Sequence, residues 1–155
     1  NTGKIEYTGS NLHGQVAIGG IIGDATTDTA AWTGEIVNTG DIIFTGTYKT
    51  VGYAGGIFGR TTVPVANAIA NCKVSAQALD GVGHISGSPR STTVIATNCK
   101  VGGIATAYDT EDESYEEEKI SASNFYKYIY GGTTDWTGVA EYDGCTFLAE
   151  KPTFE

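Results

Sequence analysis

Asp80, His84 and Ser86 are the residue types of a hydrolytic triad, and they lie close together in this chain. In such a triad the serine attacks a carbonyl carbon, the histidine takes its proton and the carboxylate orients the histidine. His84 and Ser86 share one strand face, at positions that packing residues fill in related passages of the chain. His13 lies in a polar turn without a partner in view. We therefore expect no catalytic residue and no enzymatic activity.

The acidic run at 109–118 could supply oxygen ligands for Ca²⁺. It lacks an Asp-x-Asp-x-Asp-Gly pattern, and Glu outnumbers Asp within it. Such a charged stretch cannot enter a core, which predicts an exposed excursion or a short solvated helix at 108–119. We expect no metal and no cofactor, with Ca²⁺ at 109–118 as the alternative.

The glycine-rich segment Gly52–Gly59 looks like a phosphate-binding loop, but no Lys-Ser/Thr follows it, so we expect no cofactor-binding residue there. Trp32, Trp136 and the tyrosines could stack on sugar rings if they were exposed in a row. The alternative is that these aromatic side chains cover the flank and the ends of the fold.

Three related passages stand at 9–23, 40–59 and 73–87. Each has a short β-branched strand, a polar stretch and a Gly-x-Ile-x-Gly ending. The central residues Ile21, Ile57 and Ile85 are 57 − 21 = 36 and 85 − 57 = 28 residues apart. A period near thirty is typical of stacked-repeat folds, in which equivalent residues lie about 4.8 Å apart along the axis.

Two cysteines belong to a second repeated motif, Asn-Cys-Lys-Val, which occurs at 71–74 and at 98–101. Aligning the motifs predicts that Cys72 and Cys99 are rungs of one ladder, with Ala70, Cys72 and Val74 facing inward. We expect free buried thiols, because stacked in-register side chains have poor disulfide geometry. Cys145 would join this ladder or serve the C-terminal cap.

The composition predicts an all-β fold, because 22 glycines, 3 prolines and many β-branched residues favour short strands and tight turns. Repeat spacing favours a parallel β-solenoid, and an antiparallel β-sandwich is the alternative. We expect one domain over 1–155, with coils at about 5–107, the excursion at 108–119 and an irregular, aromatic-rich C-terminal cap at 120–155. Strands are predicted at 5–8, 15–22, 35–37, 41–45, 53–58, 69–76, 82–86, 93–101, 120–129 and 138–148.

A net charge of −9 argues against nucleic acid as a partner, because binding to phosphate needs clustered Lys and Arg. No apolar run approaches the roughly 20 residues that span a bilayer, so we expect no membrane insertion by this segment. The start at Asn1 shows no signal peptide, which suggests either a processed chain or an excised domain.

The glycine-rich passages, with Asn38-Thr39-Gly40-Asp41-Ile42 before Gly55–Gly59 and Thr8-Gly9 before Gly19–Gly23, resemble the GLUG repeats of bacterial surface proteins, especially those of Bacteroidetes. The resemblance covers about residues 7–101. It implies a right-handed parallel β-helix that is secreted or on the cell surface. His84 and Ser86 depart from the repeat, and nothing after Val101 matches well.

The function expected from this resemblance is a non-catalytic adhesive or structural stalk role, with a host or bacterial surface protein or glycan as the partner. The alternative is a carbohydrate-binding or polysaccharide-active β-helix protein, although basic residues are few and scattered. Ice binding by threonine ladders is disfavoured because no regular Thr-x-Thr recurs in each repeat.

Overall fold

The structure is a computed structural model that describes residues 1–8, 15–26, 30–45, 52–76, 81–88, 95–109, 111–131 and 141–154. The first strands are β1 (Ile5–Tyr7), β2 (Val16–Gly19), β3 (Ile22–Ala25), β4 (Ile36–Asn38), β5 (Ile42–Phe44), β6 (Gly52–Gly55), β7 (Phe58–Thr61) and β8 (Val65–Ala66). They are followed by β9 (Ala68–Ala76), β10 (Gly81–Gly83), β11 (Ser86–Ser88), β12 (Ile95–Thr97), β13 (Lys100–Asp109), β14 (Ser114–Lys119), the 3₁₀ helix η1 (Phe125–Tyr128), β15 (Glu141–Asp143) and β16 (Thr146–Phe147). No α-helix occurs in these ranges, so the chain is all-β where it is described, as predicted.

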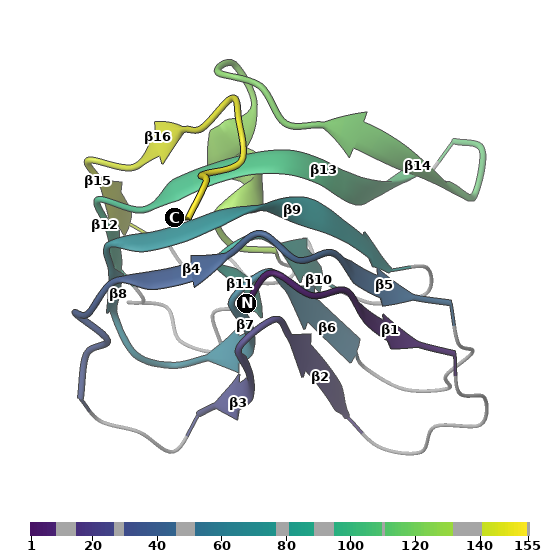
Figure 1. Ribbon diagram of the computed structural model, residues 1–155. Coiled ribbons are helices and arrows are strands. Elements are labelled where there is room, and N and C mark those ends of the chain that lie inside the picture. Colours follow the sequence, from purple (N-terminus) through teal and green to yellow (C-terminus); the bar gives the residue numbers. More distant parts are fainter. Residues whose placement is uncertain are drawn as a thin grey trace.

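The strands form one seven-stranded and three three-stranded sheets, and consecutive strands visit the sheets in a fixed order. The chain runs from β1 to β2 to β3, then from β5 to β6 to β7, and then from β9 to β10 to β11, placing one strand in each of three sheets every time. We call each such circuit a pass. Figure 1 shows the result: β1, β5, β9 and β13 lie one above another, as do β2, β6 and β10.

Among the described strands, every pairing except that of β13 with β14 is parallel. This is not the pairing of an antiparallel β-sandwich, which was the alternative fold. The register aligns Ile22 with Phe58 and Phe58 with Ser86, which is the alignment that the glycine-rich passages predicted.

Two columns of glycine allow tight bends between the second and third strands of each pass. The columns are Gly19, Gly55 and Gly83, and Gly23, Gly59, Gly87 and Gly131. A Cβ on Gly55 would lie 1.8 Å from the carbonyl oxygen of Phe58, and one on Gly87 would lie 2.6 Å from the amide nitrogen of Ala54. At these bends the backbones of neighbouring sheets are in direct contact, and no side chain fits between them. This is why the motif begins and ends with glycine.

The strands predicted at 15–22, 53–58 and 82–86 run through these bends, and that part of the prediction is wrong. Each is two short strands of different sheets, because the backbone turns at the glycines. The predicted strand at 120–129 is also wrong, because Phe125–Tyr128 forms the helix η1.

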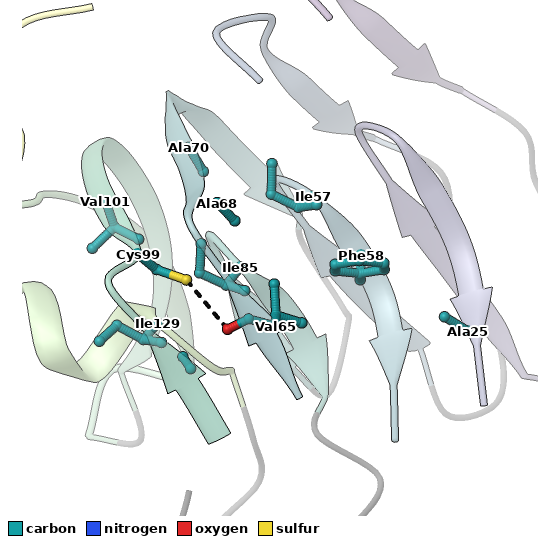
Figure 2. Close-up of a cluster of buried hydrophobic side chains, with 11 residues drawn as sticks. Ala25, Ile57, Phe58, Val65, Ala68, Ala70, Ile85, Cys99, Val101 and Ile129 are labelled. Atoms are coloured by element: carbon teal, nitrogen blue, oxygen red, sulfur yellow. Dashed lines mark hydrogen bonds between the residues drawn. The ribbon is translucent and has the colours of Figure 1, made fainter. Parts of the chain in front are cut away.

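Small and branched apolar side chains fill the interior. Ala70, Cys72 and Val74 of β9 are fully buried, as their predicted inward face requires. One cluster consists of Ala25, Ile57, Phe58, Val65, Ala68, Ala70, Ile85, Ala96, Cys99, Val101 and Ile129, most of which are labelled in Figure 2. A second consists of Ile42, Phe44, Ala54, Cys72, Val74 and Ala76.

The acidic segment forms the return strand of a hairpin. β14 pairs antiparallel with β13 through Ile104–Asp109, and β16 pairs with the start of β13 at Lys100 and Val101. Together they cover the far edge of β13. The expectation of a short helix is therefore wrong, because Ser114–Lys119 is extended and pairs residue by residue with β13.

Candidate functional site

His84 is completely buried and acts as a packing and hydrogen-bonding residue. Its Nε2 donates to the carbonyl oxygen of Cys72 at 3.0 Å, and its ring lies edge-on to Tyr128 with centroids 6.5 Å apart. Burial disfavours the imidazolium and lowers the pKa of His84 to about 4, although the hydrogen bond to Cys72 opposes this. The ring is therefore neutral at pH 7.

Ser86 takes part in a different hydrogen bond. Its hydroxyl donates to the carbonyl oxygen of Ser88 at 2.9 Å, and the Ser88 amide donates back to Ser86 Oγ at 3.3 Å. Ser86 is fully buried, and its hydroxyl is held within this local turn. Asp80 and His13 lie outside the described residues. Of the residues considered for the triad, the structure describes His84 and Ser86, and each is hydrogen-bonded to a different backbone carbonyl.

The carboxylates of the acidic hairpin are divided among separate partners. Glu117 forms an ion pair with Lys73, and Glu118 accepts hydrogen bonds from Tyr128 Oη and, at 2.8 Å, from Asn124 Nδ2. These two donors lower the pKa of Glu118. Across the ranges that the structure describes, no three His, Cys, Asp or Glu side chains converge on a point where a metal ion could bind.

A row of polar side chains crosses the sheet formed by β3, β7 and β11. Asp24, Arg60 and Ser88 stand at the same register position on these three strands, and each follows the closing glycine of its repeat. Arg60 is 8% exposed and pairs through its guanidinium with Asp24 and with Gln15. We call Asp24, Arg60 and Ser88 the polar row.

The polar row keeps two groups without hydrogen-bond partners among the described residues, Arg60 Nε and Ser88 Oγ. Burial by itself would raise the pKa of Asp24, but hydrogen bonds from Arg60 and Thr26 and the charge of Arg60 outweigh it and lower the pKa. The row thus sets one carboxylate, one guanidinium and one hydroxyl side by side; the Asp24 side chain is exposed, whereas Ser88 is fully buried.

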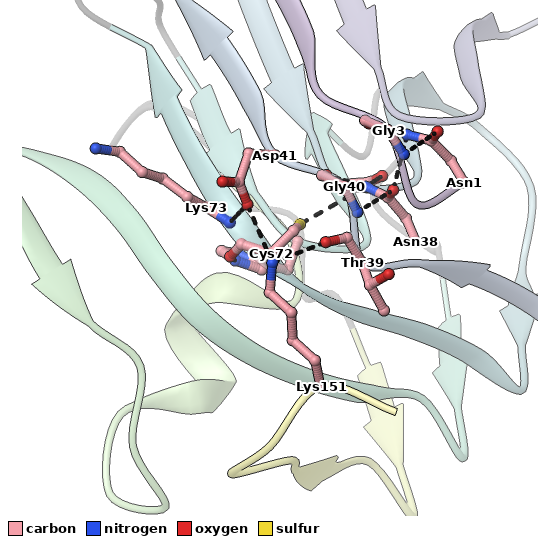
Figure 3. Close-up of polar contacts among 11 residues, drawn as sticks. Asn1, Gly3, Asn38, Thr39, Gly40, Asp41, Cys72, Lys73 and Lys151 are labelled. Carbon is pink, nitrogen blue, oxygen red and sulfur yellow. Dashed lines mark hydrogen bonds and ion pairs between the residues drawn. The ribbon is translucent and has the colours of Figure 1, made fainter. Parts of the chain in front are cut away.

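A second polar group joins successive passes at the junction between β4 and β5, shown in Figure 3. Asn38 is fully buried; its Nδ2 donates to the Gly56 carbonyl oxygen at 2.7 Å, and its Oδ1 accepts from the Gly40 amide at 3.0 Å. Asn1 Nδ2 also donates to Asn38 Oδ1, at 3.0 Å. Asn1-Thr2-Gly3 thus stacks on Asn38-Thr39-Gly40, whereas the sequence comparison had paired the latter with Thr8-Gly9.

The C-terminal tail closes over this junction. Lys151 Nζ donates to the Thr39 carbonyl oxygen at 2.9 Å and lies 3.4 Å from Asp41 Oδ1, while Asn71 Nδ2 donates to the Leu148 carbonyl oxygen at 2.6 Å. Figure 3 shows Lys151 reaching toward Thr39 and Asp41. All of these contacts hold the chain to itself, so we assign the junction a structural role.

The cysteines are placed differently from the prediction. Cys72 lies opposite Gly103, so Cys72 and Cys99 do not share a ladder. Lys100 lies opposite both Ile69 and Thr146, which puts Cys99 level with Ala68 and Cys145. The motif alignment failed because Asn98 stands at a bend before β13, whereas Asn71 lies within β9.

Trp32 packs against Phe58, with ring centroids 5.7 Å apart, and so covers the core as the second reading of the aromatic residues expected. Trp136 lies outside the described residues. Gly52–Gly59 is fully buried strand and bend, with no open loop for a phosphate.

The chain was compared with protein families, curated proteins and solved structures. No family model, curated protein or solved structure matches the chain. No helix in the described ranges is long and apolar enough to cross a membrane. The function therefore has to be argued from the arrangement itself.

Sequence reasoning missed the polar row. It placed Cys145 either in the ladder of Cys99 or in the C-terminal cap, and the register sets Cys145 beside Cys99. A signal for the row was present: Asp24, Arg60 and Ser88 directly follow Gly23, Gly59 and Gly87. Extending the repeat by one residue would have found it.

Proposed function

We propose that this chain is a non-catalytic repeat module of a secreted or cell-surface protein, built as a right-handed parallel β-helix, with an adhesive or structural stalk role. The observation that carries the proposal is the stacking of equivalent residues: Ile57, Ile85 and Ile129 stand at one position of successive passes and are all fully buried, with Phe58 N donating to Ile85 O and Ile85 N donating to Ile129 O. Parallel strands joined by crossovers are right-handed in nearly all proteins, which supports the handedness.

The candidate catalytic residues His84 and Ser86 support the same proposal, because both are packed in the interior. His84 and Ser86 occupy interior positions and bond to backbone carbonyls. Such buried groups suit a scaffold, whereas a hydrolase needs its nucleophile and base in contact and open to substrate.

The exposure of the first pass supports a stalk. Ile21 is 42% exposed, whereas Ile57 and Ile85 at the same position of later passes are 0% exposed. In a longer stack, another coil on this side would bury Ile21 as the others are buried.

The test is binding of the purified chain to arrays of glycans and of host extracellular-matrix proteins, with Ca²⁺ and with a chelator. We expect saturable binding to a surface protein or glycan that the chelator leaves unchanged, and no cleavage of any glycan. Release of shortened sugar products would overturn the non-catalytic assignment. Loss of binding in chelator would instead favour Ca²⁺ at 109–118.

The polar row favours a second candidate, carbohydrate binding. A buried guanidinium beside a carboxylate and a hydroxyl is a suitable donor and acceptor set for sugar hydroxyl or carboxylate groups. Glycan binding that Arg60→Lys and Ser88→Ala weaken at least tenfold would support this candidate. The matched control is Lys4→Ala, which removes a cation from an exposed pair with Glu6 elsewhere on the surface.

A further inference from the structure

Three successive bends of the chain share one backbone conformation. Asn67, Asn98 and Gly144 have φ angles of 58°, 53° and 64°, in the left-handed region that Asn and Gly adopt most easily. They follow β8, β12 and β15, whose residues Ala66, Thr97 and Asp143 lie in register. The bends are therefore stacked on one another.

The residue after each bend stands at one position of the stack. These residues are Ala68, Cys99 and Cys145, so the second and third of these bends place two cysteines on neighbouring rungs. Backbone hydrogen bonds fix the pair on both sides, from Asn98 N to Asp143 O at 2.8 Å and from Thr146 N to Cys99 O at 2.9 Å.

The two side chains lie on neighbouring rungs of one ladder, and the thiols influence each other: Cys145 raises the pKa of Cys99, and Cys99 lowers the pKa of Cys145. Cys99 Sγ lies 3.7 Å from the Val65 carbonyl oxygen, as Figure 2 shows, and Cys145 Sγ lies 3.5 Å from the Ala96 carbonyl oxygen. Both thiols thus lie over backbone carbonyls of the preceding pass.

We propose that Cys99 and Cys145 are a disulfide-forming pair, which locks the last strands, β15 and β16, onto β12 and β13 when the protein is oxidised. Neighbouring strands are about 4.8 Å apart, which falls within the separation of Cα atoms, about 4.4 to 6.8 Å, that a disulfide spans. The cysteines follow bends and precede the strands, so their side chains are less constrained than in the middle of a pleated strand.

The reaction needs an oxidant of the disulfide class, such as oxidised glutathione. Cys145 is the attacking residue, because it is only half-buried and the neighbouring Cys99 lowers the pKa of its thiol. Its thiolate attacks the oxidant, whose sulfur–sulfur bond breaks and releases one thiol. Cys99 then loses its proton and attacks the Cys145 sulfur, which releases the second thiol. The cysteines lose two protons and two electrons, and the oxidant becomes two thiols.

Cys72 provides a matched control within the same chain. It is fully buried, its register partner is Gly103, and burial raises the pKa of its thiol to about 12. It has no neighbouring thiol in its ladder and is fully buried, so it should stay reduced in the folded protein.

The experiment incubates the folded, full chain with oxidised glutathione and maps thiols by mass spectrometry after alkylation under denaturing conditions. Trypsin separates the three cysteines into peptides 61–73, 91–100 and 128–155, since a Lys-Pro bond resists cleavage. We expect a mass about 2 Da lower than that of the reduced chain, a linked 91–100 and 128–155 pair, and alkylated Cys72. The midpoint of thermal unfolding should rise by about 5 °C on oxidation.

Cys72→Ala should retain the mass change and the thermal shift, and Cys145→Ser should lose both. The proposal is overturned if the unmodified chain keeps three alkylatable thiols after prolonged oxidation, if Cys72 enters the linkage, or if disulfides form only between molecules. The mapping on the unmodified chain decides the matter even if a variant fails to fold.

Discussion

Asn38 joins the seven-stranded sheet to the bend between β6 and β7, because its Nδ2 donates to the Gly56 carbonyl oxygen at 2.7 Å across the interior. The same amide also bonds to both backbone polar groups of Gly40. One side chain therefore satisfies several buried backbone groups, from the β4–β5 junction and from the bend between β6 and β7.

Asn38→Ala should destabilise the protein by about 2 to 4 kcal/mol, since it leaves the Gly56 carbonyl and the Gly40 amide buried without partners. Urea denaturation monitored by circular dichroism will show this as a lower midpoint with an unchanged m-value. The control is Asn71→Ala, which removes one hydrogen bond, to Leu148, and should cost about 1 kcal/mol. Equal losses in the two variants would refute the role given to Asn38.

Gly55→Ala should prevent folding or cost more than about 3 kcal/mol, because the added Cβ would lie 1.8 Å from the Phe58 carbonyl oxygen and the backbone there cannot move freely. Gly34→Ala is the control, because nothing lies within 4 Å of the position of its Cβ, and its stability should change by no more than about 0.5 kcal/mol. Thermal unfolding of both variants is the measurement. A stable Gly55→Ala protein would contradict the glycine columns.

The stability of the chain should fall between pH 6.5 and pH 4 because of His84. Its pKa is about 4 in the folded protein and 6.5 in the unfolded chain, so the unfolded chain binds the proton first and gains stability as the pH falls through this window. The loss reaches about 3 kcal/mol near pH 4. Above pH 6.5 the effect is absent.

His84→Gln keeps a donor near the Cys72 carbonyl and removes the titrating group. The measurement is the free energy of unfolding in urea at several pH values, and the variant should be much less sensitive between pH 6.5 and pH 4.5. An identical pH dependence in both proteins would show that His84 is not the source. The carboxylates with lowered pKa, Asp24 and Glu118, contribute stability that is lost only at lower pH.

The charges on β14 should keep the hairpin edge from pairing with another molecule. Among the described strands β14 pairs only with β13, and Glu116 and Glu117 are exposed on it. Edge strands with charged side chains resist intermolecular pairing, so the double variant Glu116→Thr, Glu117→Thr should self-associate in sedimentation velocity as its concentration rises. The variant Glu111→Thr, Asp112→Thr removes the same charge from the turn and should sediment like the unmodified protein.

The Gly-x-Ile-x-Gly repeat predicted the correct register. A Cβ would clash at its first and last positions, so these positions must be glycine, and the glycines are visible in the sequence. The Asn-Cys-Lys-Val motif misled because Asn98 is in a left-handed bend whereas Asn71 is within β9, a difference that residue identity does not reveal. The strand β14 was missed since its glutamates oppose strand formation by propensity, and pairing with β13 overrides this.

Asp24 and Arg60 show a further limit. They are far apart in the chain, and each is a single charged residue among uncharged neighbours, so local patterns did not connect them. Only the register that sets β3 beside β7 brings them together. Side-chain contacts between passes, such as that of Asp24 with Arg60, can be predicted only after the repeats have been aligned residue by residue.

The distance along the chain between stacked isoleucines varies, yet backbone hydrogen bonds still join successive passes at these positions: Phe58 N donates to Ile85 O, and Ile85 N donates to Ile129 O. An entire hairpin and a 3₁₀ helix lie between Ile85 and Ile129. The framework thus accepts insertion of whole secondary-structure elements between fixed anchor points. New surface features can be added there, by evolution or by design, without rebuilding the interior.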